Sequence, residues 1–469
     1  MRTLALLFLV PAIATAQVIS WEKPIAPGLT YRMEVDSEFP RVIHALRWSQ
    51  GAPQVTARSE VAQMRLFADA GSDAREGISS LLERSGAIAG INGDFFPTSG
   101  DPLNAVVRDG LLLSRPYPGR ACFGWGSATS AAGLLEWSGS ADISSIGMEA
   151  IVGLNEDVQP NRLVLFTDSS AEARAPTPNV VVVFKIEGGG FAPTGTVNGK
   201  VTEVFRNRDS VKIPQGHAIL VKSGEDLVKM GVVMRNDEVT VKMKTTGMDW
   251  SKIDNVIGGG PMLLRGGNVA IDTLAAGFSK TFADTRHPRT AIGRTGKGDI
   301  WFVTVDGRQP MSNGASLEEL AAIMQARGCT DATNLDGGGS TTLAIFGQVM
   351  NRPSDGVERK VANGVLFFGP KPTNSLPQVV IQGPAVIEPG SVGSYWLVGS
   401  DGRVLPNLGV LWTATGPGGW IDQGGTLRPL DVGGQVTLRA FTKGITSSLT
   451  VNVTPKPAPK LEPKPKPKN

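Results

Sequence analysis

The residues best suited to chemistry in this chain lie in one polar, glycine-rich segment, Asn334-Leu-Asp-Gly-Gly-Gly-Ser-Thr-Thr342. Its three consecutive glycines have no Cβ, so the backbone can approach a ligand closely or adopt a positive φ. An amide, a carboxylate and three hydroxyls flank that bare backbone. A mixture of N–H groups, donors and acceptors suits a sugar or a phosphate. The segment therefore predicts a polar ligand site, although a plain polar turn would have the same composition.

Five further segments are built in the same way, with one or two polar residues beside glycine at the edge of an apolar run. They are Ala89–Phe96, Ile257–Leu263, Arg286–Gly293, Val305–Arg308 and Arg359–Val365. In this order the six segments resemble the phosphodiester glycosidase family, from about residue 25 to 369. The resemblance implies a hydrolase that acts on a glycosyl phosphodiester, and it does not specify the sugar.

The chemistry of glycosyl phosphodiester hydrolysis determines which side chains the site needs. A phosphate, with a second pKa of about 6, leaves more easily than a sugar alkoxide, so less proton donation is required. Cations and N–H donors must hold the phosphate, and a carboxylate must lie near the anomeric carbon or the attacking water. We expect four arginines to supply the cations: Arg286, Arg289, Arg308 and Arg359. The other expected substrate-binding residues are Asn92, Asp94, Gly259, Gly260, Thr290, Gly337, Gly338, Gly339, Ser340, Thr341 and Asn363.

Three residues are candidates for the catalytic groups. Asp336 is the first choice for the carboxylate because the glycines after it leave it approachable; alternatively, it caps the N–H groups of Ser340 or Thr341. Asp306 ends an apolar run at an Asp-Gly turn, which fits a structural turn as well as catalysis. His287 is the natural proton shuttle, because neighbouring arginines would lower its pKa and keep it neutral. Its alternative is a structural hydrogen bond.

Some of the binding candidates have a second interpretation. Asp94 stands where members of the family often carry a smaller residue, so it is not expected to be a catalytic group and is a candidate for substrate specificity or for binding a cation such as Ca²⁺. Asn92 and Asn363 can bind sugar hydroxyls or fix turns. The sequence requires no cofactor, and its three histidines and two cysteines form no zinc-type cluster. Cys122 and Cys329 could pair in an oxidising compartment or remain two buried thiols.

Residues 17–370 are predicted to form one strand-rich catalytic domain of the α+β class. A helix is expected over residues 74–84. A second is expected over Leu317–Arg327, where Ser316 and Glu319 form a capping box. Runs that predict strands outnumber the helices: Asn179–Ile186, Ala218–Lys222, Val239–Lys244, Asp299–Val305, Thr342–Phe346 and Gly364–Phe368.

A linker over residues 371–377 separates this domain from a second one. Short strand-like runs between glycine and proline turns predict a small β-sandwich over residues 378–454, similar to the immunoglobulin-like domains of secreted bacterial enzymes. Residues 455–469 alternate proline and lysine, which predicts a disordered, extended tail. The tail and sandwich could contact anionic envelope polymers, and a solvated spacer is the plainer interpretation of the tail.

The first sixteen residues predict a signal peptide, with Arg2, an apolar run from Leu4 to Val10 and an Ala-Thr-Ala site. The protein is therefore expected to be secreted, periplasmic or attached to the cell envelope, and the apolar run is too short to span a bilayer. The tail supplies +4 and the leader +1 of the formal net charge of +3, so the body carries −2. This charge argues against a nucleic-acid surface.

The expected function is a secreted hydrolase of a glycosyl phosphodiester in an envelope glycan or exopolysaccharide. Two other classes fit the same residues. One is a non-catalytic glycan-binding protein that uses the same cleft. The other is a phosphodiesterase that breaks the P–O bond instead of the C–O bond. A full set of carboxylates and arginines favours an enzyme over a binding protein, and the sequence does not separate the two bonds.

Overall fold

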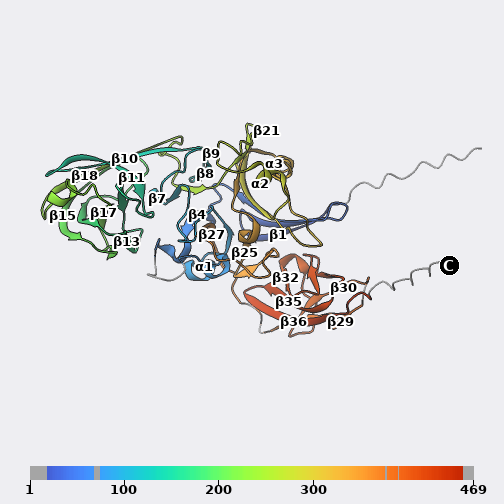
Figure 1. The fold of residues 1–469 in the computed structure, drawn as a ribbon. Coiled ribbons are helices and arrows are strands. Elements are labelled where there is room, and N and C mark those ends of the chain that lie inside the picture. The colour runs from blue at the N-terminus through green and yellow to red at the C-terminus, as the bar shows by residue number, and fades with distance from the viewer. Residues whose placement is uncertain (1–17, 68–73, 375, 377, 389, 458–469) are drawn as a thin grey trace, which may run out of the picture.

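The structure is a computed structural model that describes residues 18–457, apart from residues 68–73, 375, 377 and 389 (Figure 1). Within these residues it contains 36 β-strands and three α-helices. The predicted α+β class is wrong: the protein is mostly all-β and includes a closed seven-stranded barrel. The physical reason is that Val- and Thr-rich runs broken by glycine turns favour strands, and few segments keep a helical period. The predicted signal peptide and residues 458–469 of the tail lie outside the described residues.

An eight-stranded antiparallel sheet lies at the centre of the predicted catalytic region, in the order β1-β2-β3-β23-β22-β24-β20-β21. Its bounds are β1 Val18–Ala26, β2 Leu29–Asp36, β3 Arg41–Ser49, β20 Met262–Arg265, β21 Asn268–Val269, β22 Arg289–Thr295, β23 Asp299–Val305 and β24 Cys329–Leu335. In the register of β22 with β24, Thr290 lies opposite Leu335. This pairing brings the start of β22 next to the glycine-rich segment that follows β24.

Three helices accompany this sheet and its neighbours. α3, Leu317–Ala326, begins with the predicted capping box between Ser316 and Glu319. Its apolar residues Leu320 and Met324 are fully buried in a core that also holds residues of β22, β23 and β24. α1, Ile78–Ser85, is shorter than predicted at its start, and α2, Lys280–Asp284, was not predicted. None of the helices in the described part of the chain is both long and apolar enough to cross a membrane.

Two five-stranded sheets complete the scaffold of the site. One has the order β7-β6-β19-β8-β9, with bounds β6 Val106–Arg108, β7 Leu111–Ser114, β8 Ala121–Trp125, β9 Ser130–Leu134 and β19 Asn255–Gly258. The other has the order β26-β25-β5-β27-β4, with bounds β4 Thr56–Val61, β5 Ala89–Asn92, β25 Leu343–Ile345, β26 Gln348–Val349 and β27 Asn363–Phe368.

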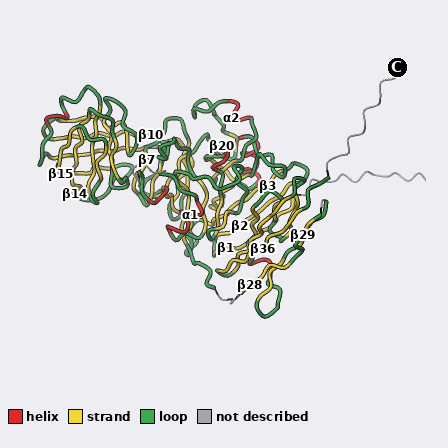
Figure 2. The backbone as a smooth tube through the Cα atoms, turned by 60° about the horizontal axis from the view of Figure 1, so that its bottom comes forward, coloured by secondary structure: helices red, strands yellow, loops and turns green. Residues whose placement is uncertain are grey.

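The closed barrel is inserted in the chain between β9 and β19 and forms one end of the molecule (Figures 1 and 2). Its order is β10-β11-β12-β17-β14-β15-β18. Its apolar side chains, among them Phe184 and Leu220, fill a core that continues into the adjacent five-stranded sheet through Val107 and Val256, so the barrel is a packed body. The bounds are β10 Glu136–Ile143, β11 Gly147–Leu154, β12 Leu163–Phe166, β14 Asn179–Glu187, β15 Gly195–Arg206, β17 His217–Ser223 and β18 Glu238–Thr246; a small ribbon, β13 Glu172–Arg174 with β16 Ser210–Lys212, lies beside it.

The C-terminal strands form three small sheets around a core that includes Trp412 and Leu438. Their bounds are β28 Val379–Gln382, β29 Val386–Ile387, β30 Gly393–Ser394, β31 Trp396–Gly399, β32 Leu411–Thr415, β33 Gly419–Ile421, β34 Thr426–Pro429, β35 Gly434–Thr442 and β36 Ile445–Val453. This C-terminal module packs on the catalytic region, where Phe346 stacks on Phe441 with ring centroids 4.8 Å apart. The domain boundaries and the immunoglobulin-like class remain predictions.

Candidate active site

The ends of β5 and β24 hold the two most informative polar segments against each other. The Asp336 N–H donates to the Gly93 carbonyl oxygen at 2.9 Å. In return, the Asn92 side-chain amide donates to the Asp336 carbonyl oxygen at 2.8 Å. The segments after residues 92 and 335, far apart in the sequence, therefore form one site.

Asp94 is buried at this junction. One carboxylate oxygen accepts the Asn104 N–H at 2.6 Å. The other, Oδ1, has no hydrogen-bond partner among the described residues. Burial raises the pKa of Asp94 to about 7, with a further rise from the nearby negative charge of Asp336; the Asn104 N–H and Arg120 oppose this shift.

Asp336 lies next to Asp94, close enough for the two carboxyl groups to interact electrostatically. Burial raises its pKa to about 6, and the charges of Arg120 and Arg359 are among the groups that oppose the rise. The Gly337 N–H donates to its Oδ1 at 2.8 Å. The nearby Ser340 hydroxyl also opposes the rise in the pKa of Asp336. Its oxygen forms no hydrogen bond with a described residue. Two carboxyl groups with raised pKa values in one site are typical of acid and base pairs.

Arg120, which immediately precedes β8, is the residue that sequence reasoning missed. Its guanidinium lies over three aromatic rings, at 4.5 Å from Phe278, 4.6 Å from Tyr117 and 5.3 Å from Phe95. Its positive charge lowers the pKa of both carboxyl groups. The signal that could have found it is the Gly119-Arg120 pair before an apolar run, the same construction as in the other segments.

The site also holds buried polar atoms that no described residue satisfies. Buried polar side-chain atoms normally have a hydrogen-bond partner, so a group of unsatisfied ones marks a place where a ligand or water binds. Around the ends of β5, β24 and β27 these atoms are Asp94 Oδ1, Arg120 Nη1, Asn334 Oδ1, Ser340 Oγ, Thr342 Oγ1 and Asn363 Nδ2.

Two arginines lie against the glycine turn that follows Asp336. A Cβ added to Gly338, which has φ +60°, would lie 3.3 Å from Arg308 Nη2. A Cβ added to Gly339 would lie only 2.1 Å from Arg359 Nη2, so a larger residue here would displace the end of that side chain. Arg359 also forms an exposed ion pair with Asp355 at 2.6 Å.

His287 lies at the edge of this group of cations. Arg308 Nη2 donates to His287 Nδ1 at 3.2 Å, so the proton of the neutral ring is on Nε2. Burial, followed by the charges of Arg289 and Arg308, lowers the pKa of His287. The ring is therefore neutral at neutral pH, as expected from its neighbours.

The other two predicted phosphate-binding arginines are held in structural contacts. Arg286 is exposed and forms an ion pair with Glu319 at 2.8 Å, at the start of α3. Arg289 is buried, and burial lowers its pKa to about 10. It donates to three backbone carbonyls in and around α2 and α3, those of Phe282, Thr285 and Ala315.

Asp306 lies apart from Asp94 and Asp336, in a buried polar chain next to the C-terminal module. Its Oδ2 is 3.6 Å from His44 Nε2, and the Tyr31 hydroxyl lies 2.7 Å from His44 Nδ1. The Arg352 N–H donates to Asp306 at 3.1 Å. A small cavity lined by Asp306 and Trp412 lies between the two parts of the protein. These contacts suit the structural interpretation of Asp306.

The remaining predicted binding residues mostly join the strand ends to one another. The Thr290 hydroxyl donates to Asn92 Oδ1 at 2.8 Å, and its oxygen lies 3.4 Å from the Thr341 hydroxyl. Asn363 Oδ1 accepts the Asp94 N–H at 2.7 Å. These bonds fix the position of Asp94 and of the segment after β24.

The glycines after β19 allow backbones to pack closely. The Gly259 N–H donates to the Ala121 carbonyl oxygen at 3.0 Å, and the Gly260 N–H to that of Asn334 at 2.7 Å. A Cβ on Gly259 would lie 2.3 Å from the Asn334 oxygen. Cys122, on β8, and Cys329, on β24, are separate buried thiols. In the described part of the chain, no three His, Cys, Asp or Glu side chains are grouped to hold a metal ion.

Part of this chain is similar to a known protein family. Residues 192–368 match the family model of phosphodiester glycosidases. The resemblance predicted from the six segments is therefore confirmed. The matched region includes Asp336, His287, Arg308 and Arg359, whereas Asp94 and Arg120 lie before it.

Individual relatives cover less of the chain. An SPbeta prophage-derived uncharacterized protein, YomE, from Bacillus subtilis is 41% identical over 92 residues, which span 19% of this chain and 14% of that protein. The N-acetylglucosamine-1-phosphodiester alpha-N-acetylglucosaminidase of Mus musculus is 32% identical over 102 residues, 20% of each protein. The crystal structure of a hypothetical protein from Synechocystis has a similar fold, with a TM-score of 0.63 and 23% identity over 76% of this chain and 64% of that one.

Proposed function

We propose that this protein hydrolyses a glycosyl phosphodiester by breaking the bond between the anomeric carbon and the phosphate oxygen. One observation carries the proposal: Asp94 and Asp336, with pKa values raised to about 7 and about 6, lie in one site with Arg120. The family match over residues 192–368 supports a phosphodiester glycoside as the substrate class.

The unequal pKa values suggest a role for each carboxyl group. Asp336 is ionised above about pH 6, so it is the group that takes the proton of the attacking water. Asp94, with a pKa of about 7, is mostly protonated below that pH and can donate a proton to the departing phosphate oxygen. The water oxygen bonds to the anomeric carbon, and the electrons of the broken C–O bond stay with the phosphate. Because phosphate leaves easily, proton donation by Asp94 is the lesser contribution.

The cations around the glycine turn suit the phosphate. Arg308 and Arg359 lie against Gly338 and Gly339, and charge-assisted hydrogen bonds from arginine to phosphate are strong. His287, neutral and with its proton on Nε2, can donate one more hydrogen bond. These groups would stabilise the charge that develops on the leaving phosphate.

An aromatic cluster beside Asp94 helps to hold the Arg120 guanidinium, which lies over two of its rings. Phe95 follows Asp94 in the chain, and its ring lies 5.0 Å from Phe278 and 6.2 Å from Phe282. All three side chains are only partly buried. With the leader predicted from the sequence, the proposed substrate is a glycan of the cell envelope or an exopolysaccharide.

The test is hydrolysis of a panel of sugar-1-phosphodiesters by the purified chain without its leader, in ¹⁸O-labelled water. Label in the released sugar supports C–O cleavage. Label in the phosphate would mean P–O cleavage and overturn the proposed mechanism in favour of a phosphodiesterase. No turnover of any substrate, with binding retained, would favour the glycan-binding class. Asp336→Asn serves as the inactive control.

A further inference from the structure

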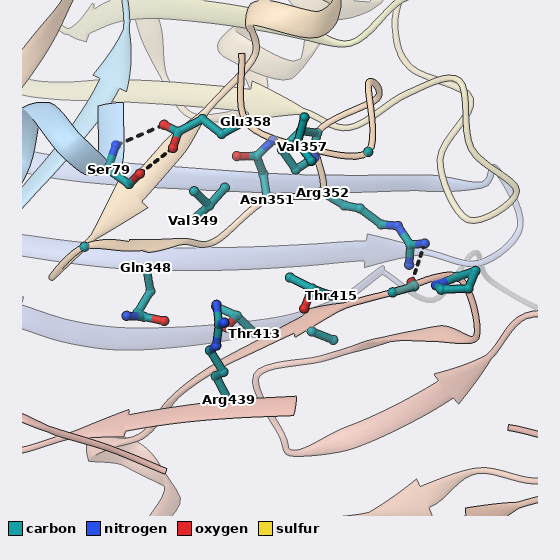
Figure 3. Close-up of a pocket in the computed structure, with 16 residues that line it drawn as sticks. Ser79, Gln348, Val349, Asn351, Arg352, Val357, Glu358, Thr413, Thr415 and Arg439 are labelled. Carbon is teal, nitrogen blue, oxygen red and sulfur yellow. Dashed lines mark hydrogen bonds between the residues drawn. The ribbon is translucent and has the colours of Figure 1, made fainter. Parts of the chain in front are cut away.

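A cavity of about 660 Å³ lies between the catalytic region and the C-terminal module (Figure 3). One wall comes from residues 347–358 together with Ser79, and the other comes from β32 and β35. Neither Asp94 nor Asp336 is among its lining residues, so it is separate from the candidate active site. Its volume is in the range of cavities that bind small ligands.

The cavity wall carries an unneutralised positive charge. Its charged lining residues are Arg352, Glu358 and Arg439. Glu358 is bonded to the N–H of Ser79 at 2.9 Å and to its hydroxyl. The Arg352 guanidinium donates hydrogen bonds to two carbonyl oxygens of the C-terminal module, those of Gly416 and Gly419.

Arg439 differs from these two residues. It extends from β35 into the cavity (Figure 3), and among the described residues it forms no ion pair or side-chain hydrogen bond. A guanidinium without a partner at the wall of a cavity is suited to a carboxylate or a phosphate, which it can bind with two parallel hydrogen bonds.

The remaining lining favours a saccharide over a lipid. The Gln348 amide and the Thr415 hydroxyl offer donors and acceptors for sugar hydroxyls. Short apolar side chains form much of the remaining surface and would cover the C–H groups of a sugar: Val349, Pro353, Val357, Ala414 and Pro417. No leucine, isoleucine, methionine or aromatic side chain, which would suit an acyl chain, is among the lining residues.

One loop connects this cavity with the candidate active site. Arg352 and Glu358 of the 351–360 loop line the cavity. In the same loop, Asp355 and Arg359 form the ion pair that lies against Gly339. A glycan held in the cavity therefore lies beside the loop that contributes to the turn after Asp336.

We propose that this cavity is a second saccharide-binding site, which takes an anionic segment of a glycan and holds its carboxylate or phosphate on Arg439. Binding in this cavity does not depend on catalysis. That the bound glycan is also the polymer cut at Asp336 rests on the proposed function.

The test is calorimetric titration of the chain without its leader with three oligosaccharides of equal length. One carries carboxylates (oligogalacturonate), one carries phosphates (phosphorylated oligomannose), and one is neutral (an oligoglucose). We expect at least one anionic oligosaccharide to bind more tightly than the neutral one. The anionic oligosaccharide with the higher affinity identifies the charged group that Arg439 holds. Arg439→Gln should weaken that binding at least about tenfold, from loss of a charge-assisted hydrogen bond. Arg403→Gln, at an 87% exposed side chain of the same module, makes the same charge change outside the cavity and should have no effect.

Two outcomes would overturn the proposal: no binding of either anionic probe, or equal affinity of the wild type and Arg439→Gln. Thr415→Trp gives a second measurement, because an indole at this exposed position fills the cavity and should also remove binding. Both variants should hydrolyse a small glycosyl phosphodiester like the wild type and show a raised KM for a polymer. If the wild type hydrolyses no phosphodiester, the proposed function fails and the binding result still stands.

Discussion

Asp94 and Asp336 follow the ends of two strands from different sheets, and a single guanidinium, that of Arg120, lowers the pKa of both carboxyl groups. Neither carboxyl group would have a pKa of about 6 or 7 in an exposed turn, because the rise comes from burial.

Asp336→Asn should remain folded and lose turnover by a factor of about 10² or more, the usual cost of removing a catalytic acid or base. The reason is that an amide cannot accept the proton of the attacking water. The measurement is kcat on a sugar-1-phosphodiester, with folding checked by circular dichroism. Asp284→Asn, at an exposed residue of α2, is the control. Near-normal turnover of folded Asp336→Asn would remove Asp336 from the mechanism.

The pH dependence of kcat/KM should be bell-shaped, with limbs near pH 6 and pH 7. Activity should fall below about pH 6 as Asp336 takes up a proton, and above about pH 7 as Asp94 loses its proton. Asp94→Asn should remove the alkaline limb, because an amide does not titrate. An alkaline limb that persists in Asp94→Asn would assign it to another group.

Asp94→Asn should also make the folded protein more stable at alkaline pH. The folded-state pKa of Asp94, about 7, is above the ordinary value of 3.8 for an aspartate, so ionisation of the buried carboxyl group opposes folding. This cost is fully present above about pH 7 and disappears as the pH falls toward 4. The expected gain at pH 8 is on the order of 2–4 kcal/mol in the free energy of unfolding. Denaturant unfolding at pH 8 and pH 4 measures it, and Asp401→Asn, an exposed change, should show no such difference.

Arg120→Met should raise the pKa of both carboxyl groups, because it removes the positive charge that lowers them. We expect the acid limb of the pH profile to move to higher pH, and kcat/KM at pH 6 to fall about tenfold or more. Arg47→Met is a matched control, since Arg47 also lies over an aromatic ring, that of Trp301, at 5.8 Å. An acid limb that stays in place would show that Arg120 does not act on Asp336.

Arg289→Lys should lower the free energy of unfolding, and it should change activity on phosphodiesters and on aryl glycosides by the same factor. The guanidinium donates to three carbonyl oxygens that an ammonium group cannot reach together, so we expect a loss on the order of 3 kcal/mol in the free energy of unfolding.

Arg308→Lys, in contrast, should keep the melting temperature and lose activity mainly on phosphodiesters relative to aryl glycosides. A phosphodiester-selective loss in Arg289→Lys would instead support the phosphate-binding role expected from the sequence.

Local features of the fold could be predicted from the sequence because they depend on neighbouring residues. The strand Asp299–Val305 and the capping box of α3 arise from short-range patterns and are present as predicted. The fold class was wrong because strand-favouring runs dominate the chain more than the two expected helices indicated, and closure of the barrel depends on pairing of distant segments. The polar, glycine-rich segments identified the family, since glycines and polar residues at strand ends are visible in the sequence itself.

The tertiary structure alone decided which charged residues share the site. Arg289 and Arg308 stand in similar polar turns, yet one donates to buried carbonyls and the other lies against the glycine turn. Asp94 and Arg120 acquire their importance only when β5, β8 and β24 come together and bury a carboxyl group beside a guanidinium. The direction of a side chain and the water around it are set by residues far away in the sequence, and those two factors determine whether a charge binds a ligand or holds the fold together.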